Sequence, residues 1–275
     1  MINETVNNKK TSNERLKKIF SAFNSSLQGL FGIFILFLIW YLACKLTSVG
    51  ELLADPITVL KLLGSWFLEP IGRMTLPGHI LISMRRVFTA YIILSVVGIF
   101  IGIIIGYSKL GRALLNPLYE MVRPVPGVAW IPVTIMLFGI GEDAKVFLII
   151  LGCISGVILQ ASRGVRLVDR QLVGAARVLG ASEGQVFWKV ILPSCVPSIF
   201  VGLNGALASS WSCVLAAEMI SAFEGVGWII TAGASRGNTA QILAGMIPIG
   251  VMGVILTSLI TWAEKKLCRW TERSE

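Results

Sequence analysis

Six long apolar runs constrain this chain more than any other feature of its sequence. They lie near residues 29–47, 86–107, 114–138, 144–162, 195–217 and 241–263. An α-helix needs roughly 20 residues to cross the hydrocarbon core of a bilayer. The composition agrees, since 55% of the 275 residues are hydrophobic and only 14% are charged. Because a single apolar segment satisfies its own backbone in lipid only as a helix, the runs predict an all-α integral membrane protein with a six-helix transmembrane bundle.

The basic residues predict which side of the membrane each segment faces. Six spans place both termini on one side, and more than half of the 24 lysines and arginines fall in segments 1–28, 163–189 and 264–275 of that side. Loops rich in lysine and arginine stay in the cytoplasm. We therefore expect a cytoplasmic segment at 1–28, a transmembrane domain at 29–263 and a cytoplasmic tail at 264–275. This topology accounts for the net charge of +9 without a nucleic-acid partner.

The segment 164–194, between the fourth and fifth runs, is polar and basic, yet strongly patterned. In its first half, apolar residues recur at helical spacing at Leu172, Ala175, Ala176 and Leu179. Gly180 follows at the position where the end of a helix needs a left-handed residue. The pattern predicts a short helix that ends at a glycine hinge on the cytoplasmic side.

The second half of this segment carries the signals of another helix. Ser182 and Gln185 have the spacing of a capping box, in which each side chain binds the backbone of the other residue. An apolar stripe then follows at Val186, Phe187, Val190 and Ile191. We expect this helix to end at Pro193. Such a helix pair has too little apolar surface to fold as a separate domain and too much to remain exposed to water. We therefore expect it to dock on another protein.

The third apolar run is interrupted by prolines. Residues 123–127 read Arg-Pro-Val-Pro-Gly, and Pro132 follows. Because proline removes a backbone donor and restrains the residue before it, the helix is predicted to break or kink here. A broken helix is tolerated at membrane depth only where protein or water surrounds it. Arg123 therefore either lines a passage through the membrane or lies near a membrane face and pairs with Glu120. Both interpretations stay open.

The other runs contain small and polar residues that two explanations fit. In the fifth run, Asn204, Ser209 and Ser212 are candidates for the lining of a passage, although tight helix packing explains the same residues. In the second and fourth runs, glycines recur four residues apart, which lets helix backbones approach closely in lipid. These glycines are Gly98, Gly102, Gly106, Gly152 and Gly156. The alternative, that small residues are simply common in such helices, also stays open.

Two segments on the expected outer side of the membrane have the pattern of peripheral structure. Residues 48–79 are amphipathic and contain three prolines, which predicts an interfacial helix and loop. His79 is the one histidine of the chain, and at the edge of the second run it is interpreted as a surface residue. Residues 223–228 read Phe-Glu-Gly-Val-Gly-Trp and predict a turn with an interfacial aromatic residue.

The sequence lacks the motifs of an ATPase or a membrane enzyme. No G-x-x-x-x-G-K-[ST] loop is present, and a single histidine excludes an H-E-x-x-H zinc site. The five cysteines have no metal-ligand spacing and are interpreted as reduced packing residues. We therefore expect no catalytic residue, no metal and no cofactor in this chain. What remains is a transport protein, either driven by a partner or working alone as a secondary carrier.

The segment 164–194 resembles the EAA loop of ABC-importer permeases. The usual form of that loop is E-A-A-x-x-x-G, followed by an apolar helix and L-P, and this chain departs from it by having Gly174 in place of the glutamate. Five positions match the form, namely Ala175, Ala176, Gly180, Leu192 and Pro193. The resemblance implies that an ATPase docks on Gly174, Ala175, Ala176, Gly180, Ala181, Leu192 and Pro193.

A second match narrows the resemblance. Arg-Pro-Val-Pro at 123–126, Ala-Trp-Ile-Pro at 129–132 and Phe-Gly-Ile-Gly at 138–141 are similar to the nitrate, sulfonate, taurine and bicarbonate branch of these permeases. The resemblance covers roughly residues 80 to 265. It implies a six-helix bundle of the type I ABC-importer permease kind, with a cytoplasmic coupling helix pair. It also implies a small anionic substrate such as an aliphatic sulfonate, taurine or nitrate. Similar permeases carry neutral pyrimidine, thiamine-precursor or riboflavin-type compounds, so a neutral substrate stays open as the alternative.

The same resemblance implies an assembly and a mechanism. The expected partners are a second permease copy in a homodimer, two cytoplasmic ABC ATPase subunits that bind Mg-ATP, and an extracytoplasmic solute-binding protein. The expected location is the bacterial plasma (inner) membrane, as a multi-pass protein with both termini in the cytoplasm. Closure of the ATPase pair would move residues 170–190 as a lever, which would turn the passage from inward-facing to outward-facing.

Overall fold

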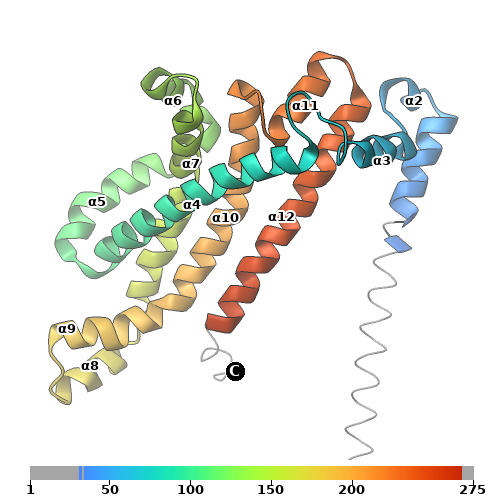
Figure 1. The fold of residues 1–275 in the computed structure, drawn as a ribbon. Coiled ribbons are helices and arrows are strands. Elements are labelled where there is room, and N and C mark those ends of the chain that lie inside the picture. The colour runs from blue at the N-terminus through green and yellow to red at the C-terminus, as the bar shows by residue number, and fades with distance from the viewer. Residues whose placement is uncertain (1–30, 33, 268–275) are drawn as a thin grey trace, which may run out of the picture. The chain divides into compact units, whose positions relative to one another are not determined.

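The computed structural model describes residues 31, 32 and 34–267, and these are almost entirely helical (Figure 1). The chain divides into two compact units, residues 1–62 and residues 63–275. The expected cytoplasmic segment 1–28 lies outside the described residues, as does most of the expected tail 264–275.

The first unit contains a helix that includes residues 34–46, then α2 (Val49–Leu52) and the start of α3 (Pro56–Ser65). Asp55 begins α3, because its carboxylate accepts hydrogen bonds from the backbone N–H groups of Ile57 (3.0 Å) and Thr58 (3.1 Å). These are donors that the first turn of a helix leaves free. Helices are therefore found within the predicted amphipathic segment 48–79.

The second unit opens with α4 (Leu76–Tyr107), which begins well before the predicted start near residue 86. Pro77 lies in its first turn, where a missing N–H costs little. The interpretation of His79 as a surface residue is wrong, because His79 and Arg86 are both buried in this helix. Their polar atoms are hydrogen-bonded to other parts of the unit, which is the condition for burying polar groups.

The predicted break in the third run is confirmed. After α4, the single residue Ser108 leads into α5 (Lys109–Val122), and its hydroxyl accepts a hydrogen bond from the N–H of Gly111. The chain then bends by 92° before the short helix η1 (Gly127–Trp130) and α6 (Ile131–Phe138). Pro124 has no N–H to donate to the carbonyl four residues earlier, and Pro126 adopts an extended conformation with ψ of 141°, so the helix ends here.

The next elements are α7 (Glu142–Arg166), the short helices α8 (Arg170–Val178) and α9 (Glu183–Val186), and α10 (Leu192–Ser221). The prediction that the second short helix ends at Pro193 is wrong. A π-helical turn at Phe187–Ile191 carries α9 directly into α10, with the N–H of Leu192 donating to the carbonyl of Phe187. The wider turn precedes the proline, which occupies the first turn of α10.

The last two described helices are α11 (Val226–Ser235) and α12 (Thr239–Leu267). The predicted turn at 223–228 is only partly correct, because the helix α11 begins at Val226. Four of the described helices are long and apolar enough to cross a membrane, and six spans result if each of two bent helix pairs counts as one span. The described part of the chain therefore agrees with a helical membrane protein of up to six spans.

The core of the second unit lies between α4, α7 and α10, which cross one another in Figure 1. The glycines of α4 make the close contacts predicted for them. A Cβ atom placed on Gly102 would lie 2.6 Å from the Cβ of Ala161, and one on Gly106 would lie 2.7 Å from the Cβ of Val165. Gly156 of α7 is different, since a Cβ there would meet nothing within 4 Å. Close approach of α4 to α7 thus depends on the α4 glycines.

Candidate functional site

The helices α8 and α9 form a capped helix pair at one end of the second unit, opposite α6 and α11 (Figure 1). Asp169 begins α8 by accepting a hydrogen bond from the N–H of Gln171 at 2.8 Å. Gly180 has φ of 82°, the left-handed conformation predicted for it. Ser182 and Gln185 form the predicted capping box, with the Gln185 side chain 2.9 Å from the Ser182 N–H. Local sequence signals therefore account for this helix pair.

The inner face of the helix pair holds it against the rest of the unit. Ala176 and Ala181 pack with Val173 on a buried cluster that includes Val186 and Ile191. Across the turn between the helices, Arg177 and Glu183 form an exposed ion pair. Such exposed pairs contribute little stability, so the apolar inner face is what fixes α8 and α9 in place.

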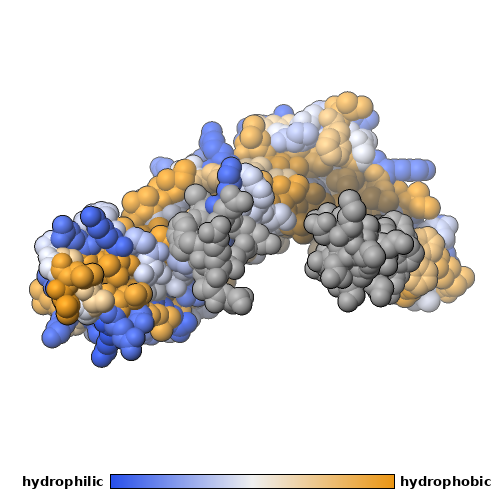
Figure 2. Space-filling view, turned by 90° about the horizontal axis from the view of Figure 1, so that it is seen from below, coloured by the Kyte–Doolittle hydropathy of each residue, from blue (hydrophilic) through white to orange (hydrophobic). Residues whose placement is uncertain are grey.

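The outer face of the helix pair is exposed and apolar at its tip. The side chains of Val178 and Leu179 are 89% and 86% exposed, and Leu172 is also exposed. Figure 2, which views the molecule from below, shows apolar side chains surrounded by hydrophilic ones at this end. Exposed apolar side chains rimmed by polar residues are typical of surfaces that contact a protein, a membrane or a ligand.

The structure divides the residues that were predicted to dock an ATPase into three places. Gly174, Ala175 and Gly180 lie exposed on the helix pair. Ala176 and Ala181 face inward and support it. Leu192 and Pro193 lie at the start of α10, beyond the π-helical turn, where Leu192 lines a cavity against α4. Val178 was missed by the sequence reasoning, although its apolar side chain next to Leu179 in a polar segment was a usable signal.

Gly174, the departure from the usual glutamate, lies in open space. A Cβ atom placed there would meet nothing within 4 Å, and its φ is not in the left-handed region. Neither sterics nor backbone conformation therefore requires glycine at this position. A glutamate side chain fits here without any change in the fold of this chain.

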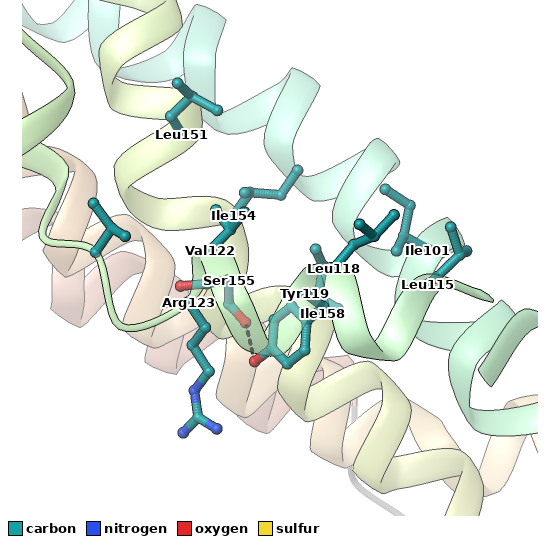
Figure 3. A pocket seen from close by; sticks show the side chains of 11 residues that line it. Ile101, Leu115, Leu118, Tyr119, Val122, Arg123, Leu151, Ile154, Ser155 and Ile158 are labelled. Carbon is teal, nitrogen blue, oxygen red and sulfur yellow. Dashed lines mark hydrogen bonds between the residues drawn. The ribbon is translucent and has the colours of Figure 1, made fainter. Parts of the chain in front are cut away.

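The second candidate region is the break between α5 and η1. Arg123 is the C-terminal cap of α5, and its side chain is 41% exposed. Its guanidinium lies 3.8 Å from the carboxylate of Glu120, which is itself exposed. Arg123 is one of the residues that line a cavity of about 220 Å³, and Figure 3 shows its guanidinium pointing away from the aliphatic side chains of that cavity. The positive charge is therefore presented to the surroundings of the unit and not to its interior.

The position of this break is fixed by contacts with two other helices. The Tyr119 hydroxyl donates to the carbonyl of Ser155 on α7 at 3.2 Å. On the other side of the break, a Cβ on Gly127 would lie 3.0 Å from the Cα of Gly152 and 3.6 Å from the sulfur of Cys213. The broken segment is thus seated between α7 and α10, so Arg123 is held by an ordered framework.

The predicted pathway residues of α10 have different environments. Ser209 and Ser212 are exposed on one face of the helix together with Gly205. Asn204 instead donates from its side-chain amide to the hydroxyl of Thr261 on α12, at 3.3 Å. The Asn204 side chain therefore joins α10 to α12, whereas the two serines are exposed; that these residues line a passage stays a prediction.

These features define a class: a helical membrane protein with a capped, exposed helix pair at one end and a broken, charged span. The model of the family described as "Binding-protein-dependent transport system inner membrane component" matches residues 98–272. The chain belongs to this family. The family consists of permease subunits of ABC importers, so this chain is a transport subunit and not an enzyme, and a separate subunit hydrolyses ATP.

Two relatives are similar over nearly their whole length. The taurine transport system permease protein TauC of Escherichia coli is 33% identical over 266 residues, which cover 96% of each chain. The nitrate import permease protein NrtB of Leptolyngbya laminosa is 32% identical over 241 residues, or 86% of this chain and 85% of that protein. These similarities confirm the branch that the motifs at 123–141 predicted.

A solved structure shares the fold. The MetNI methionine ABC transporter, in an inward-facing conformation, includes a chain that matches with a TM-score of 0.56 and 22% identity, covering 68% of this chain and 91% of that one. The predicted permease fold of the type I importer kind is thereby confirmed.

Proposed function

We propose that this chain is the permease subunit of an ATP-driven importer of a small anion such as an aliphatic sulfonate, taurine or nitrate. The observation that carries the proposal is Arg123, whose charge is exposed at the break of a membrane span. If Lys109–Phe138 is one span, Arg123 lies near its middle and far from both ends. A cation there is costly unless it meets water or an anion. TauC and NrtB are named for taurine, which carries a sulfonate group beside its ammonium group, and for nitrate, so both names support a substrate with an anionic group.

The proposed passage lies between two copies of this chain. The residues from Met121 to Pro126 are all exposed in the single subunit, as are Ser209 and Ser212 of α10. Proline-broken backbone with free carbonyl groups is not stable against lipid. A second copy facing this region would bury it and leave a polar passage between the subunits. This arrangement also gives each importer two docking helix pairs.

The proposed docking site for the ATPase is the exposed face of α8 and α9. Gly174, Ala175 and Gly180 allow close approach, and Val178 and Leu179 supply the apolar contact. Two ATPase subunits carrying Mg-ATP would bind here on the cytoplasmic side. The extracytoplasmic solute-binding protein would deliver substrate at the opposite end. No cofactor of this chain is part of the proposal.

The test is uptake by the reconstituted importer after replacement of Arg123 with glutamine. We expect uptake of taurine, an alkanesulfonate or nitrate, whichever the wild type transports, to fall about tenfold, or about 1.4 kcal/mol. Arg85→Gln is the matched control, because Arg85 is an exposed arginine on α4. Unchanged anion uptake by Arg123→Gln would remove the argument for an anion.

A neutral substrate is the second candidate. The observation that favours it is the carboxylate of Glu120, which lies 3.8 Å from Arg123 and offsets its charge. Uptake of a pyrimidine, thiamine precursor or riboflavin by the reconstituted importer, with no uptake of the three anions, would select this candidate. Transport by the chain reconstituted without any ATPase would instead identify a secondary carrier.

A further inference from the structure

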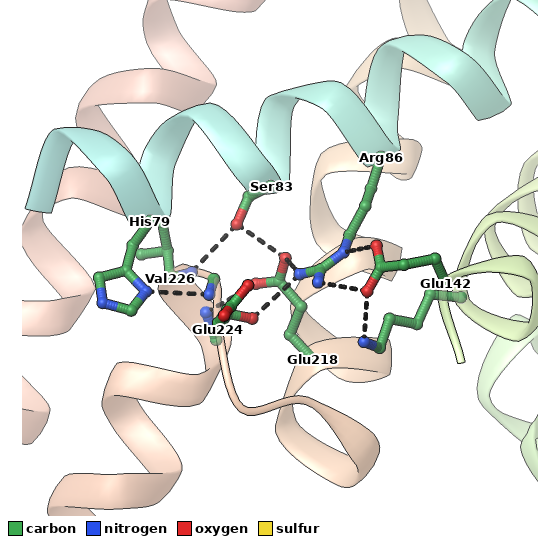
Figure 4. Close-up of polar contacts among 10 residues, drawn as sticks. His79, Ser83, Arg86, Glu142, Glu218, Glu224 and Val226 are labelled. Carbon is green, nitrogen blue, oxygen red and sulfur yellow. Dashed lines mark hydrogen bonds and ion pairs between the residues drawn. The ribbon is translucent and has the colours of Figure 1, made fainter. Parts of the chain in front are cut away.

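Arg86 lies at the centre of a polar cluster at the end of the second unit that carries α11 (Figure 4), and this cluster is buried except for Glu142, whose side chain is 44% exposed. Its guanidinium forms a fork with the Glu142 carboxylate at the start of α7, with both N–O distances 2.6 Å. Its third nitrogen donates to the Glu218 carboxylate of α10 at 2.7 Å and to the carbonyl of Glu224 at 3.0 Å. One side chain thus joins α4, α7, α10 and the loop before α11.

The same cluster caps the first turn of α11. The N–H of Gly227 donates to the Glu218 carboxylate at 2.9 Å, and that of Val226 donates to the hydroxyl of Ser83 at 3.0 Å. The N–H of Gly225 donates to Nδ1 of His79 at 3.0 Å, so Nε2 of His79 carries the hydrogen that it donates to the carbonyl of Ile71. Side chains from α4 and α10 therefore satisfy donors that a helix start leaves free.

The charges of this cluster balance within it. Arg86 and Lys145 carry two positive charges, and Glu142 and Glu218 carry two negative charges, all joined by ion pairs. The cluster therefore has no spare charge with which to bind a substrate ion. Burying the Arg86–Glu218 pair costs free energy that the attraction between the two charges only partly returns. We infer that the cluster fixes the relative positions of α4, α7, α10 and the loop before α11, and that it does not add to the stability of the fold.

The cluster is linked to the docking helix pair by one continuous helix. From Glu183 to Ile220 the chain forms a helix of 38 residues, on the order of 57 Å long at 1.5 Å per residue. The helix α9 lies at one end, and Glu218 lies near the other. A displacement of α9 along or around this axis is therefore passed to Glu218, because the helix stays continuous through the turn at Phe187–Ile191 and through Pro197.

We propose that the Arg86–Glu218 cluster is the joint that carries motion of α10 to two outer loops. One loop leads into Glu142 and displays Ile140, which is exposed. The other displays Phe223, whose side chain is 76% exposed and whose neighbour Glu224 is bonded to Arg86. Arg86 and Glu218 are positioning residues in this proposal. It rests on the proposed function, because it assumes that ATP-driven motion begins at α8 and α9.

The test follows the two ends of α10 separately. A bimane fluorophore is attached either to Gly184→Cys on α9, where an added Cβ meets nothing within 4 Å, or to Phe223→Cys, in a background whose native cysteines are replaced. The complete importer is measured without nucleotide and after trapping with ATP and vanadate. We expect the emission to change at both positions. With Glu218→Gln, we expect the change at position 184 to remain and the change at position 223 to be lost.

The substitution Glu218→Gln places an amide N–H₂ group where one carboxylate oxygen accepts hydrogen bonds, so it breaks the joint at nearly constant volume. Glu224→Gln is the matched control, because only the carbonyl of Glu224 bonds to Arg86, and it should leave both changes intact. If Glu218→Gln does not assemble, Ser83→Ala replaces it as a milder break, since Ser83 bonds both Glu218 and Val226.

The outcomes separate the two proposals. If the bimane emission still changes at both positions in an assembled Glu218→Gln or Ser83→Ala importer, the proposal that the cluster is a joint would be wrong. No nucleotide-dependent change at either position in the unsubstituted background, once that background is shown to hydrolyse ATP, would overturn the assumed ATP-driven motion instead. Loss of the change at position 223 alone would support the joint, because a merely structural role would affect both positions or neither.

Discussion

At the scale of single residues, the chain shows why polar groups in apolar sequence have to be placed by their partners. His79 and Arg86 lie in the second apolar run or at its edge, and sequence spacing alone gave His79 the role of a surface residue. In the fold, His79 and Arg86 bond to residues more than 130 positions away. By contrast, the Ser182 capping box was predictable because both of its partners lie within four residues.

Gly174 provides a prediction at this scale. Replacing it with glutamate adds a side chain in open space and improves helix propensity by roughly 0.5–1 kcal/mol. We therefore expect Gly174→Glu to leave the melting temperature unchanged or raised, and to bind the ATPase within about twofold of the wild type. Co-purification of the ATPase measures its binding, and thermal unfolding in detergent measures the melting temperature. Loss of ATPase binding with intact folding would mean that the partner needs the space at Gly174.

At the scale of elements, the helix pair α8–α9 has one face packed on the rest of the unit and one exposed face. Sequence signals predicted both helices, the capping box at Ser182 and the glycine hinge, because these depend on neighbours in the chain. It did not predict that Ala176 faces inward while Val178 faces outward, because that depends on the cluster around Val186. Nor did it predict that Pro193 continues the helix, since the π-helical turn before it has no recognised sequence signal.

A charge at the tip of this pair tests the docking face. We expect Val178→Asp to weaken ATPase binding about 30-fold, the effect of losing a contact worth about 2 kcal/mol, with no effect on folding because Val178 makes no buried contact. Leu68→Asp is the control, since Leu68 is equally exposed but lies outside α8 and α9. Titration of the purified ATPase against each variant measures the affinity. Equal affinities for the two variants would exclude this face as the docking site.

At the scale of the whole second unit, three crossing helices carry the fold, and their separation is set by glycine. The glycine spacing of the second run predicted this contact, and Gly102 and Gly106 make it. The same spacing also predicted a close contact at Gly156, but a Cβ atom placed there would meet nothing within 4 Å. A repeat of small residues marks a helix face, but only the partner helix decides which of them are needed.

The two kinds of glycine form a matched pair of variants. Gly102→Ala would place a methyl group 2.6 Å from the Cβ of Ala161 and 2.7 Å from the carbonyl oxygen of Ile158, so α4 and α7 have to separate. We expect a loss of about 1–3 kcal/mol and a lower melting temperature in detergent. Gly156→Ala should be neutral or slightly stabilising. Equal melting temperatures for the two variants would contradict the packing described here.

The corner between α4 and α5 contains one residue, Ser108, and consecutive Cα atoms are about 3.8 Å apart. Such a corner has no slack. A longer loop can accommodate inserted residues. At this corner, an inserted residue would rotate α5 and displace the elements that follow it. The end of α4 and the start of α5 must therefore move together. The first flexible point after this corner is the proline break at Arg123, so α4 and α5 move as one body up to that break.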